Sequence, residues 1–193
     1  MKAYECLTKQ GVCDGEYAIV PVQPEHIESI RQWRNTQLDV LRQTMPISQQ
    51  QQVDYYAKHI WPSMSELMPA NIVVSYLCEG IPIGYGGLVH IAWQDLRAEV
   101  SFLLASERTT DAAIYSADFR RFLGLIKQLA FDRLNFHRLF TETYSIRQLH
   151  IATLEQSGFI LEGVMREHVR IGGLPVDSII HGCLKKYERQ YER

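Results

Sequence analysis

The order of secondary-structure signals across residues 98–145 constrains the fold more than any other feature of the sequence. A mixed apolar run at 97–105 predicts a strand buried on both faces, and "HRLFTETY" at 137–144 predicts a second strand. Between them, 116–131 has apolar residues spaced as i, i+3, i+4 and i+7, which predicts an amphipathic helix. A strand–helix–strand crossover of this kind must place its two strands parallel.

The rest of the chain predicts a mixed α/β fold. The further elements are expected in this order: a strand at 16–23, helices at 24–35 and 49–60, meandering strands at 70–80 and 81–93, a helix at 146–157, and a hairpin of strands at 158–171 and 176–184. Ser48 and Gln51 form a capping-box pattern, and Gly172-Gly173 favours a tight hairpin turn. We therefore expect one domain over 1–193, with a single mixed, largely antiparallel sheet flanked by helices.

Composition excludes several classes of function. The chain has 193 residues, of which 46% are hydrophobic and 22% charged, and its net charge is −2. A nucleic-acid binder is usually basic, and a membrane span needs about 18 consecutive apolar residues, so we expect neither partner. The first ten residues lack the apolar core of a signal peptide, which predicts a cytoplasmic protein. The scattered cysteines and histidines have no metal-ligand spacing, so we expect no metal.

The joint between the strand at 97–105 and the following helix is a candidate anion site. The first turn of a helix has free N–H groups and the positive end of the helix dipole. Thr109, Thr110 and Ser116 can add hydroxyl donors, and Arg108 can add a positive charge. The alternative is that the hydroxyl groups, together with Asp111, only cap the helix, and Asp111 would also repel a phosphate.

Several motifs in a characteristic order resemble the GNAT superfamily of acyl-CoA-dependent N-acetyltransferases. They are Trp33-Arg34-Asn35, "IGYGGLVHI" at 83–91, "RAEVSFLL" at 97–104, and the ending "SGFILEGVMREHVRIGGLPVDSIIHGCL" with Gly158-Phe159, Glu162-Gly163, Arg166 and Asp177. The resemblance covers about residues 17 to 186. It is strongest to the branch that contains the ribosomal-protein N-terminal acetyltransferases and the amino-sugar N-acetyltransferases.

The resemblance implies a GNAT fold in which the parallel central strands splay apart and hold acetyl-CoA between them. The pantetheine would pair with the backbone of the central strand, and the pyrophosphate would lie on the following loop. Relatives write that loop as R/Q-x-x-G-x-G/A, whereas this chain has Tyr115, Ser116 and Ala117 at the corresponding places. The cofactor-binding residues expected are Phe102, Leu103, Leu104, Arg108, Thr109, Thr110, Tyr115, Ser116, Ala117 and Arg147.

Glu99 is the first candidate for the general base that an acetyl transfer to an amine needs. The alternative is an ordinary carboxylate at the rim of the site that pairs with an arginine such as Arg97. Relatives often carry a proton-donating tyrosine four residues before Gly-Phe, where this chain has Leu154. Tyr144 is the candidate that could donate the proton in its place. The alternative is that Tyr144 is only a half-buried aromatic residue of a strand. Arg147 replaces a common asparagine and can reach a cofactor phosphate or an anionic substrate, or it is a solvated arginine.

The resemblance implies an acceptor site formed by the first two helices and the final hairpin. The front of the chain offers the arginines and aromatic residues Arg31, Arg34, Arg42, Trp33, Tyr55, Tyr56 and Trp61. Arginines bind phosphates and aromatic rings stack on sugars or bases, so the set suits a nucleotide-linked amino sugar. Tyr85 and His90 on the third strand are further candidates. For any one residue, the alternative of a core tryptophan or a solvated arginine is favoured over a role in binding.

Three functions remain open at this stage. The first is N-acetylation of a small-molecule primary amine by acetyl-CoA. The second is acetylation of a protein N-terminus, as in the ribosomal-protein type. The third is a GNAT-fold binding module that has lost catalysis, as the missing glycines suggest. A homodimer is left open as the oligomeric state.

Overall fold

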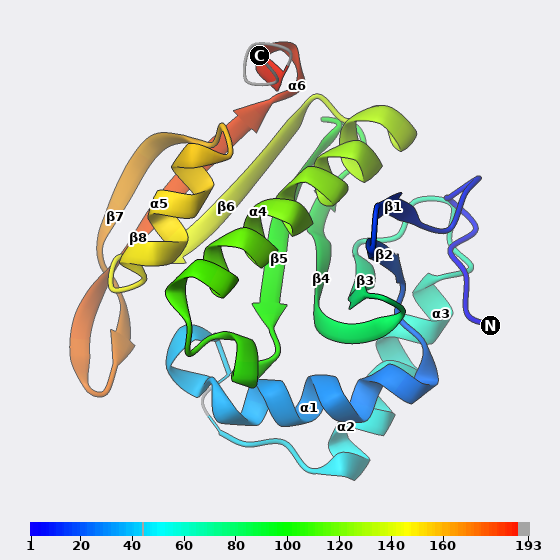
Figure 1. Ribbon diagram of the computed structural model, residues 1–193, viewed down its shortest axis with the longest axis horizontal. Coiled ribbons are helices and arrows are strands. Elements are labelled where there is room, and N and C mark those ends of the chain that lie inside the picture. The colour runs from blue at the N-terminus through cyan, green and yellow to red at the C-terminus, as the bar shows by residue number, and fades with distance from the viewer. Residues whose placement is uncertain (44, 189–193) are drawn as a thin grey trace.

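The predicted parallel pair lies at the centre of one mixed sheet. The structure is a computed structural model that describes residues 1–43 and 45–188. In that part of the chain, the sheet has eight strands in the order β1-β2-β3-β4-β5-β6-β8-β7 (Figure 1). The strands are β1 Val12–Asp14, β2 Tyr17–Pro21, β3 Ile72–Cys78, β4 Ile81–Ala92, β5 Arg97–Leu104, β6 Arg138–Tyr144, β7 Ile160–Ile171 and β8 Leu174–Leu184. Only β5 and β6 pair in parallel, as the crossover requires.

Helices cover both faces of the sheet and one of its ends. They are the 3₁₀ segments Pro24–His26, Leu38–Val40 and Ser106–Arg108, and the helices α1 Ile27–Thr36, α2 Gln49–Tyr55, α3 Trp61–Ser63, α4 Ala112–Lys127, α5 Gln148–Gln156 and α6 Lys185–Glu188. Five-residue and six-residue π-helical segments continue α2 and α4. Helices α4 and α5 lie side by side over one face, while α1 crosses the end of the sheet where β5 ends (Figure 1).

The two parallel strands separate soon after they meet. They share three paired positions, the last of which joins Glu99 to Phe140. Strand β5 then continues to Leu104 with β4 as its neighbour, and β6 continues to Tyr144 with β8 as its neighbour. The edges that face each other beyond Glu99 therefore do not pair, and the splay implied by the family resemblance is present.

The hairpin at the end of the chain supplies the antiparallel partner of β6. Gly172 and Gly173 have φ values of 58° and 82°, which matches the predicted tight turn. The second strand of the hairpin, β8, inserts between β6 and β7, and this leaves β7 at the edge of the sheet. Because β8 pairs with β6 along seven positions, it holds β6 in place while β5 diverges.

Aromatic packing joins helix α4 to the central strands. The ring of Phe102 on β5 lies 4.5 Å from the ring of Phe119 and 4.7 Å from that of Phe122, measured between centroids. Phe122 also meets Tyr76 of β3 edge-on at 5.5 Å. Phe119 and Phe122 are fully buried, so the apolar face predicted for this helix forms the core of the domain.

Two glycines keep strands β3, β4 and β5 close together. A Cβ atom on Gly86 would lie 2.1 Å from the carbonyl oxygen of Ser101. Gly87 has a φ of +139°, and a Cβ there would lie 2.0 Å from the carbonyl oxygen of Ile72. Side chains are excluded at both positions, which explains the two adjacent glycines in "IGYGGLVHI".

Three details of the sequence prediction were wrong. Helix α4 begins at Ala112 rather than at 116, because Asp111 caps it through the N–H groups of Ala113 and Ile114. The second helical stretch, expected at 49–60, continues through α3 to Ser63, since proline is tolerated in the first turn of a helix. Strand β1 was not predicted, because it is only three residues long and too short to show an alternating pattern.

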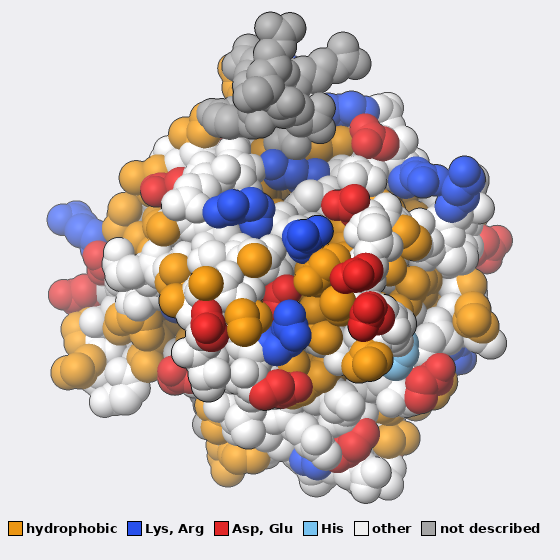
Figure 2. Space-filling view, in the orientation of Figure 1, with side chains coloured by type: hydrophobic (Ala, Val, Ile, Leu, Met, Phe, Trp, Pro, Cys, Tyr) orange, Lys and Arg blue, Asp and Glu red, His pale blue; other side chains and the backbone are white. Residues whose placement is uncertain are grey.

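The described surface carries mixed charge. On the face shown in Figure 2, basic and acidic side chains are interspersed over the helices. A net charge of −2 spread in this way gives no extended basic field. Across residues 1–43 and 45–188, no helix combines the length and the apolarity that a bilayer crossing requires.

We expect that Phe122→Ala will lower the free energy of unfolding by about 3–5 kcal/mol, because it removes the ring that links α4 to β3 and β5. Urea denaturation followed by circular dichroism measures the effect. Ile114→Ala on the same helix is the matched control, because Ile114 is 42% exposed and should change stability little. Equal losses in the two variants would contradict this account of the core.

Candidate active site

Three adjoining cavities follow the end of the sheet where β5 and β6 diverge. The gap cavity, of about 210 Å³, is lined by both strands. The tyrosine cavity, of about 520 Å³, lies on its α1–α2 side and has walls of Tyr55, Tyr56 and Tyr85. The helix-end cavity, of about 560 Å³, lies between the ends of α1, α4 and α5. Arg34 and Arg42 line both the gap and tyrosine cavities, and Arg147 and His150 line both the gap and helix-end cavities.

Glu99 lies in the gap cavity at the last paired position of β5. Its side chain is only 11% exposed. One carboxylate oxygen lies 2.7 Å from Nδ1 of His90, and the other accepts a 3.3 Å hydrogen bond from Arg42. The same Arg42 nitrogen also donates to Glu142 of β6 at 2.8 Å. Arg97, the partner suggested in the alternative, pairs with Asp95, and the arginine that pairs with Glu99 is Arg42.

A distortion of β4 places His90 next to Glu99. The register between β4 and β5 shifts after Val89, and His90 has a φ of +49°. Non-glycine residues seldom adopt this left-handed conformation, and when they do it is often at a functional site. A regular strand would keep the side chain in the alternating pattern, so the sequence alone did not indicate that His90 contacts Glu99.

Tyr144 also lines the gap cavity, at the end of β6. Burial raises the pKa of Tyr144, and the neighbouring Arg42 guanidinium partly opposes that rise. The phenol therefore stays protonated at neutral pH. Leu154, which stands at the tyrosine position of many relatives, is fully buried in the core.

The tyrosine cavity contains a fixed arginine. Arg34 of α1 donates to the Tyr85 hydroxyl at 2.6 Å and to Oε1 of Gln43 at 2.8 Å. Burial raises the pKa of Tyr85, while Arg34 lowers it in part. The described lining residues of this cavity include Arg34 and Arg42 and no carboxylate. Trp33 does not line it: this residue is 8% exposed and belongs to the hydrophobic core, so the sequence assignment to the acceptor site is corrected.

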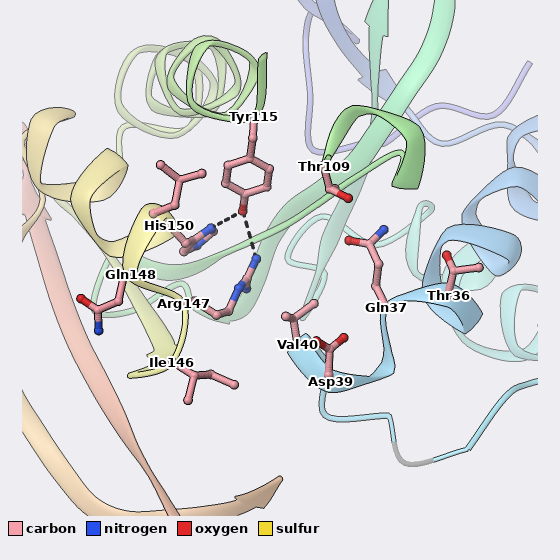
Figure 3. Close-up of a pocket in the computed structure, with 11 residues that line it drawn as sticks. Thr36, Gln37, Asp39, Val40, Thr109, Tyr115, Ile146, Arg147, Gln148 and His150 are labelled. Atoms are coloured by element: carbon pink, nitrogen blue, oxygen red, sulfur yellow. Dashed lines mark hydrogen bonds between the residues drawn. The ribbon is translucent and has the colours of Figure 1, made fainter. Parts of the chain in front are cut away.

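Tyr115 points into the helix-end cavity but does not fill it (Figure 3). Its hydroxyl lies 2.7 Å from Nδ1 of His150 and accepts a 3.0 Å hydrogen bond from Arg147. Burial lowers the pKa of His150 well below its ordinary value, and the charge of Arg147 lowers it further. His150 is therefore neutral, and its Nδ1 shares a hydrogen bond with the hydroxyl of Tyr115.

A carboxylate occupies two of the amides at the start of α4, in the glycine-poor joint. The Asp111 carboxylate accepts hydrogen bonds from the N–H groups of Ala113 and Ile114, at 2.7 and 3.1 Å. The capping role that the sequence left open is thus occupied by Asp111. Thr109 lines the helix-end cavity, and its hydroxyl donates to the carbonyl of Ser106.

Other residues expected at the cofactor loop lie elsewhere. Arg108 makes two hydrogen bonds, of 2.6 and 3.2 Å, to the carboxylate of Asp118, which is 2% exposed. Thr110 donates to the carbonyl of Glu107 at the surface. Ser116 and Ala117 lie inside α4, where Ser116 faces Thr153 of α5 and Ala117 is exposed. The four residues do not line the helix-end cavity, because α4 starts earlier than expected.

The residues that line the gap cavity are compatible with a bound acyl-CoA chain. Thr141 on β6 lines the gap cavity, and its hydroxyl is buried with no protein partner, so a ligand polar group can satisfy it. Phe102 lines the same cavity. Leu103 and Leu104 have buried side chains and can act only through their backbone, and the Leu104 carbonyl already accepts from Gln37.

A sheet that splays over a buried carboxylate, with cavities on both sides, defines an acyl-CoA-dependent transferase. Residues 19–180 match the family model described as "Acetyltransferase (GNAT) domain". Since this match spans well over half of the sequence, the chain belongs to the GNAT family of acetyltransferases. It is an N-acetyltransferase that uses acetyl-CoA as its co-substrate.

Solved structures support the same fold. The spermidine N-acetyltransferase from Vibrio cholerae, in complex with CoA and spermine, is 18% identical with a TM-score of 0.76, and the match covers 93% of this chain and 100% of that one. A structure described as a "Probable acetyltransferase" is 20% identical with a TM-score of 0.67, covering 90% and 95%. No curated protein gives a significant sequence match. Within residues 1–43 and 45–188, no group of three or more His, Cys, Asp or Glu side chains is placed to hold a metal ion.

We expect Arg108→Gln to destabilise the protein by about 1–3 kcal/mol, because it leaves the buried Asp118 carboxylate without its charged partner. Thermal unfolding measures the loss. CoA affinity, measured by calorimetry on the folded variant at low temperature, should be unchanged. A large loss of CoA affinity with unchanged stability would instead return Arg108 to the cofactor site.

Proposed function

We propose that the protein transfers the acetyl group of acetyl-CoA to the primary amine of a small molecule bound in the tyrosine cavity. The observation that carries this proposal is the position of Glu99, a buried carboxylate that lines the gap cavity. It pairs across the strands with Val89, which lines both the gap cavity and the tyrosine cavity. Acetyl-CoA supplies the acetyl group as a reactive thioester. Val89 and Ser101 line both cavities, so an amine in one lies next to a thioester in the other.

Glu99 acts as the general base in this proposal. A protonated amine has no free electron pair, and Glu99 takes its proton directly or through a water molecule. Arg42 balances the charge of the carboxylate, and His90 holds its second oxygen at 2.7 Å. The exposed side of His90, whose side chain is 61% accessible, offers the proton a route to solvent.

Tyr144 is the proposed proton donor to the departing thiolate. It lies in the gap cavity with Glu99 and Thr141, and its raised pKa keeps the hydroxyl protonated. The acid and the base then come from the two diverging strands.

The lining of the tyrosine cavity favours an acceptor that carries negative charge. Arg34 and Arg42 contribute positive charge, the three tyrosines and three glutamines contribute ring faces and amides, and the described lining contains no carboxylate. A nucleotide-linked amino sugar has phosphates for the arginines and rings for the tyrosines. The spermidine N-acetyltransferase of similar fold suggests a polyamine as the competing acceptor, but a polycation would meet like charge here.

We expect Glu99→Gln to lower kcat about a hundredfold or more while leaving the Kd for CoA unchanged, because the amide cannot accept the amine proton. A thiol-release assay and calorimetry measure the two quantities. Glu142→Gln is the matched control, because Glu142 shares Arg42 and the gap cavity and should lose much less activity. An undiminished rate in Glu99→Gln removes Glu99 from the mechanism.

We expect Arg34→Gln to raise KM for a UDP-linked amino sugar about tenfold, because one charge-assisted contact to the phosphates is lost. KM for acetyl-CoA should not change. Arg31→Gln is the control on the same helix, since Arg31 pairs with Glu28 and does not line the cavity. A panel that also contains spermidine and N-terminal peptides decides the acceptor class: turnover of spermidine or a peptide, with none of the amino sugar, contradicts the proposal.

A further inference from the structure

The cofactor's diphosphate needs a positive partner that the start of α4 does not offer. Family relatives place glycine-rich backbone there, but in this chain Asp111 occupies the N–H groups of Ala113 and Ile114 with a negative charge. Arg108 is also engaged, since both of its hydrogen bonds go to the buried Asp118. Two of the helix amides and the Arg108 side chain, which the sequence suggested for phosphate binding, are therefore already engaged within the protein.

Arg147 is the cation that faces the helix-end cavity. It stands at the N-cap position of α5 and lines both this cavity and the gap cavity, so it borders the path between them. Its guanidinium donates to the Tyr115 hydroxyl at 3.0 Å, and that hydroxyl is hydrogen-bonded to Nδ1 of His150 at 2.7 Å (Figure 3). An arginine held at one nitrogen keeps its other donors for a ligand.

The chain of hydrogen bonds behind Arg147 is rigid because its inner members are buried. Tyr115 is 8% exposed and His150 is 7% exposed. The imidazole of His150 stacks on Phe119 at a centroid distance of 4.1 Å. The tyrosine at a usual glycine position thus holds a side chain that carries positive charge, where a glycine would instead expose backbone amides.

We propose that Arg147, positioned by Tyr115 and His150, binds the diphosphate of acetyl-CoA in the helix-end cavity. This inference rests on the family's use of acetyl-CoA and is independent of the proposed acceptor. Thr109 and Thr36 also line this cavity, with their hydroxyl groups donating to backbone carbonyls, so Arg147 supplies the charged contact. Asp39 on the opposite wall is exposed to solvent, so its repulsion of an anion is screened.

Calorimetric titration without an acceptor amine tests the inference. For Arg147→Gln, we expect the Kd for CoA to rise about tenfold or more, as one charge-assisted contact is lost. The same rise is expected with 3′-dephospho-CoA, whereas pantetheine, which lacks phosphates, should bind as weakly to the variant as to the wild type. A rise with CoA alone would assign Arg147 to the 3′-phosphate and overturn the diphosphate assignment.

Two further variants separate binding from folding. Arg120→Gln is the control, because Arg120 on the outer side of α4 pairs with Gln156 and does not line the cavity. Tyr115→Phe keeps the buried ring but removes both hydrogen bonds, and we expect an intermediate loss of CoA affinity with a Tm near that of the wild type. The inference is overturned if Arg147→Gln binds CoA as the wild type does, or if Arg120→Gln loses as much affinity.

Discussion

The divergence of β5 from β6 is the constraint on which the rest of the structure depends. Backbone N–H and C=O groups normally find partners, yet the facing edges beyond Glu99 share no ladder. Strand β4 holds one side through Gly86 and Gly87, and β8 holds the other, so the gap persists because each strand is anchored by its outer neighbour. A ligand in the gap can hydrogen-bond to the backbone groups that do not pair along these edges, so the gap can serve as a binding site.

Charge is balanced across the same gap by an arginine from outside the sheet. Arg42 comes from the segment between α1 and α2 and contacts Glu99 on β5 as well as Glu142 on β6. Two carboxylates that face each other across a cavity would repel, and a shared guanidinium reduces that cost. The segment that carries Arg42 also borders the tyrosine cavity, so the charge environment of Glu99 and the lining of that cavity share one residue.

The sequence predicted the parts of this molecule that depend on local periodicity and on order along the chain. The crossover, the amphipathic face with Phe119 and Phe122, and the glycine turns were all recognisable, because each is set by neighbouring residues. The contact of His90 with Glu99 was not recognisable. It depends on an irregularity of β4 in which His90 has a φ of +49°, and no residue pattern predicts that conformation. Trp33 was placed in the acceptor site because helical spacing does not say which of two adjacent faces meets the core. The catalytic and substrate-binding roles of the candidate residues remain predictions.

The missing glycines are best understood through the position of Asp111. Once a carboxylate caps α4, an anion at the same helix end would face a fixed negative charge, and glycines there would no longer serve phosphate binding. The constraint on residue 115 is then relaxed, and a tyrosine can reach across to α5, where it meets both His150 and Arg147. Backbone amides are weak donors individually, but the fold fixes their positions. Arg147 is instead a single charged donor, and its side chain must itself be held in place. The buried imidazole of His150 and its stacking on Phe119 supply that rigidity. The absence of the family's loop signature is thus linked to the hydrogen bonds of Tyr115 with His150 and Arg147, because the same residue position accounts for both.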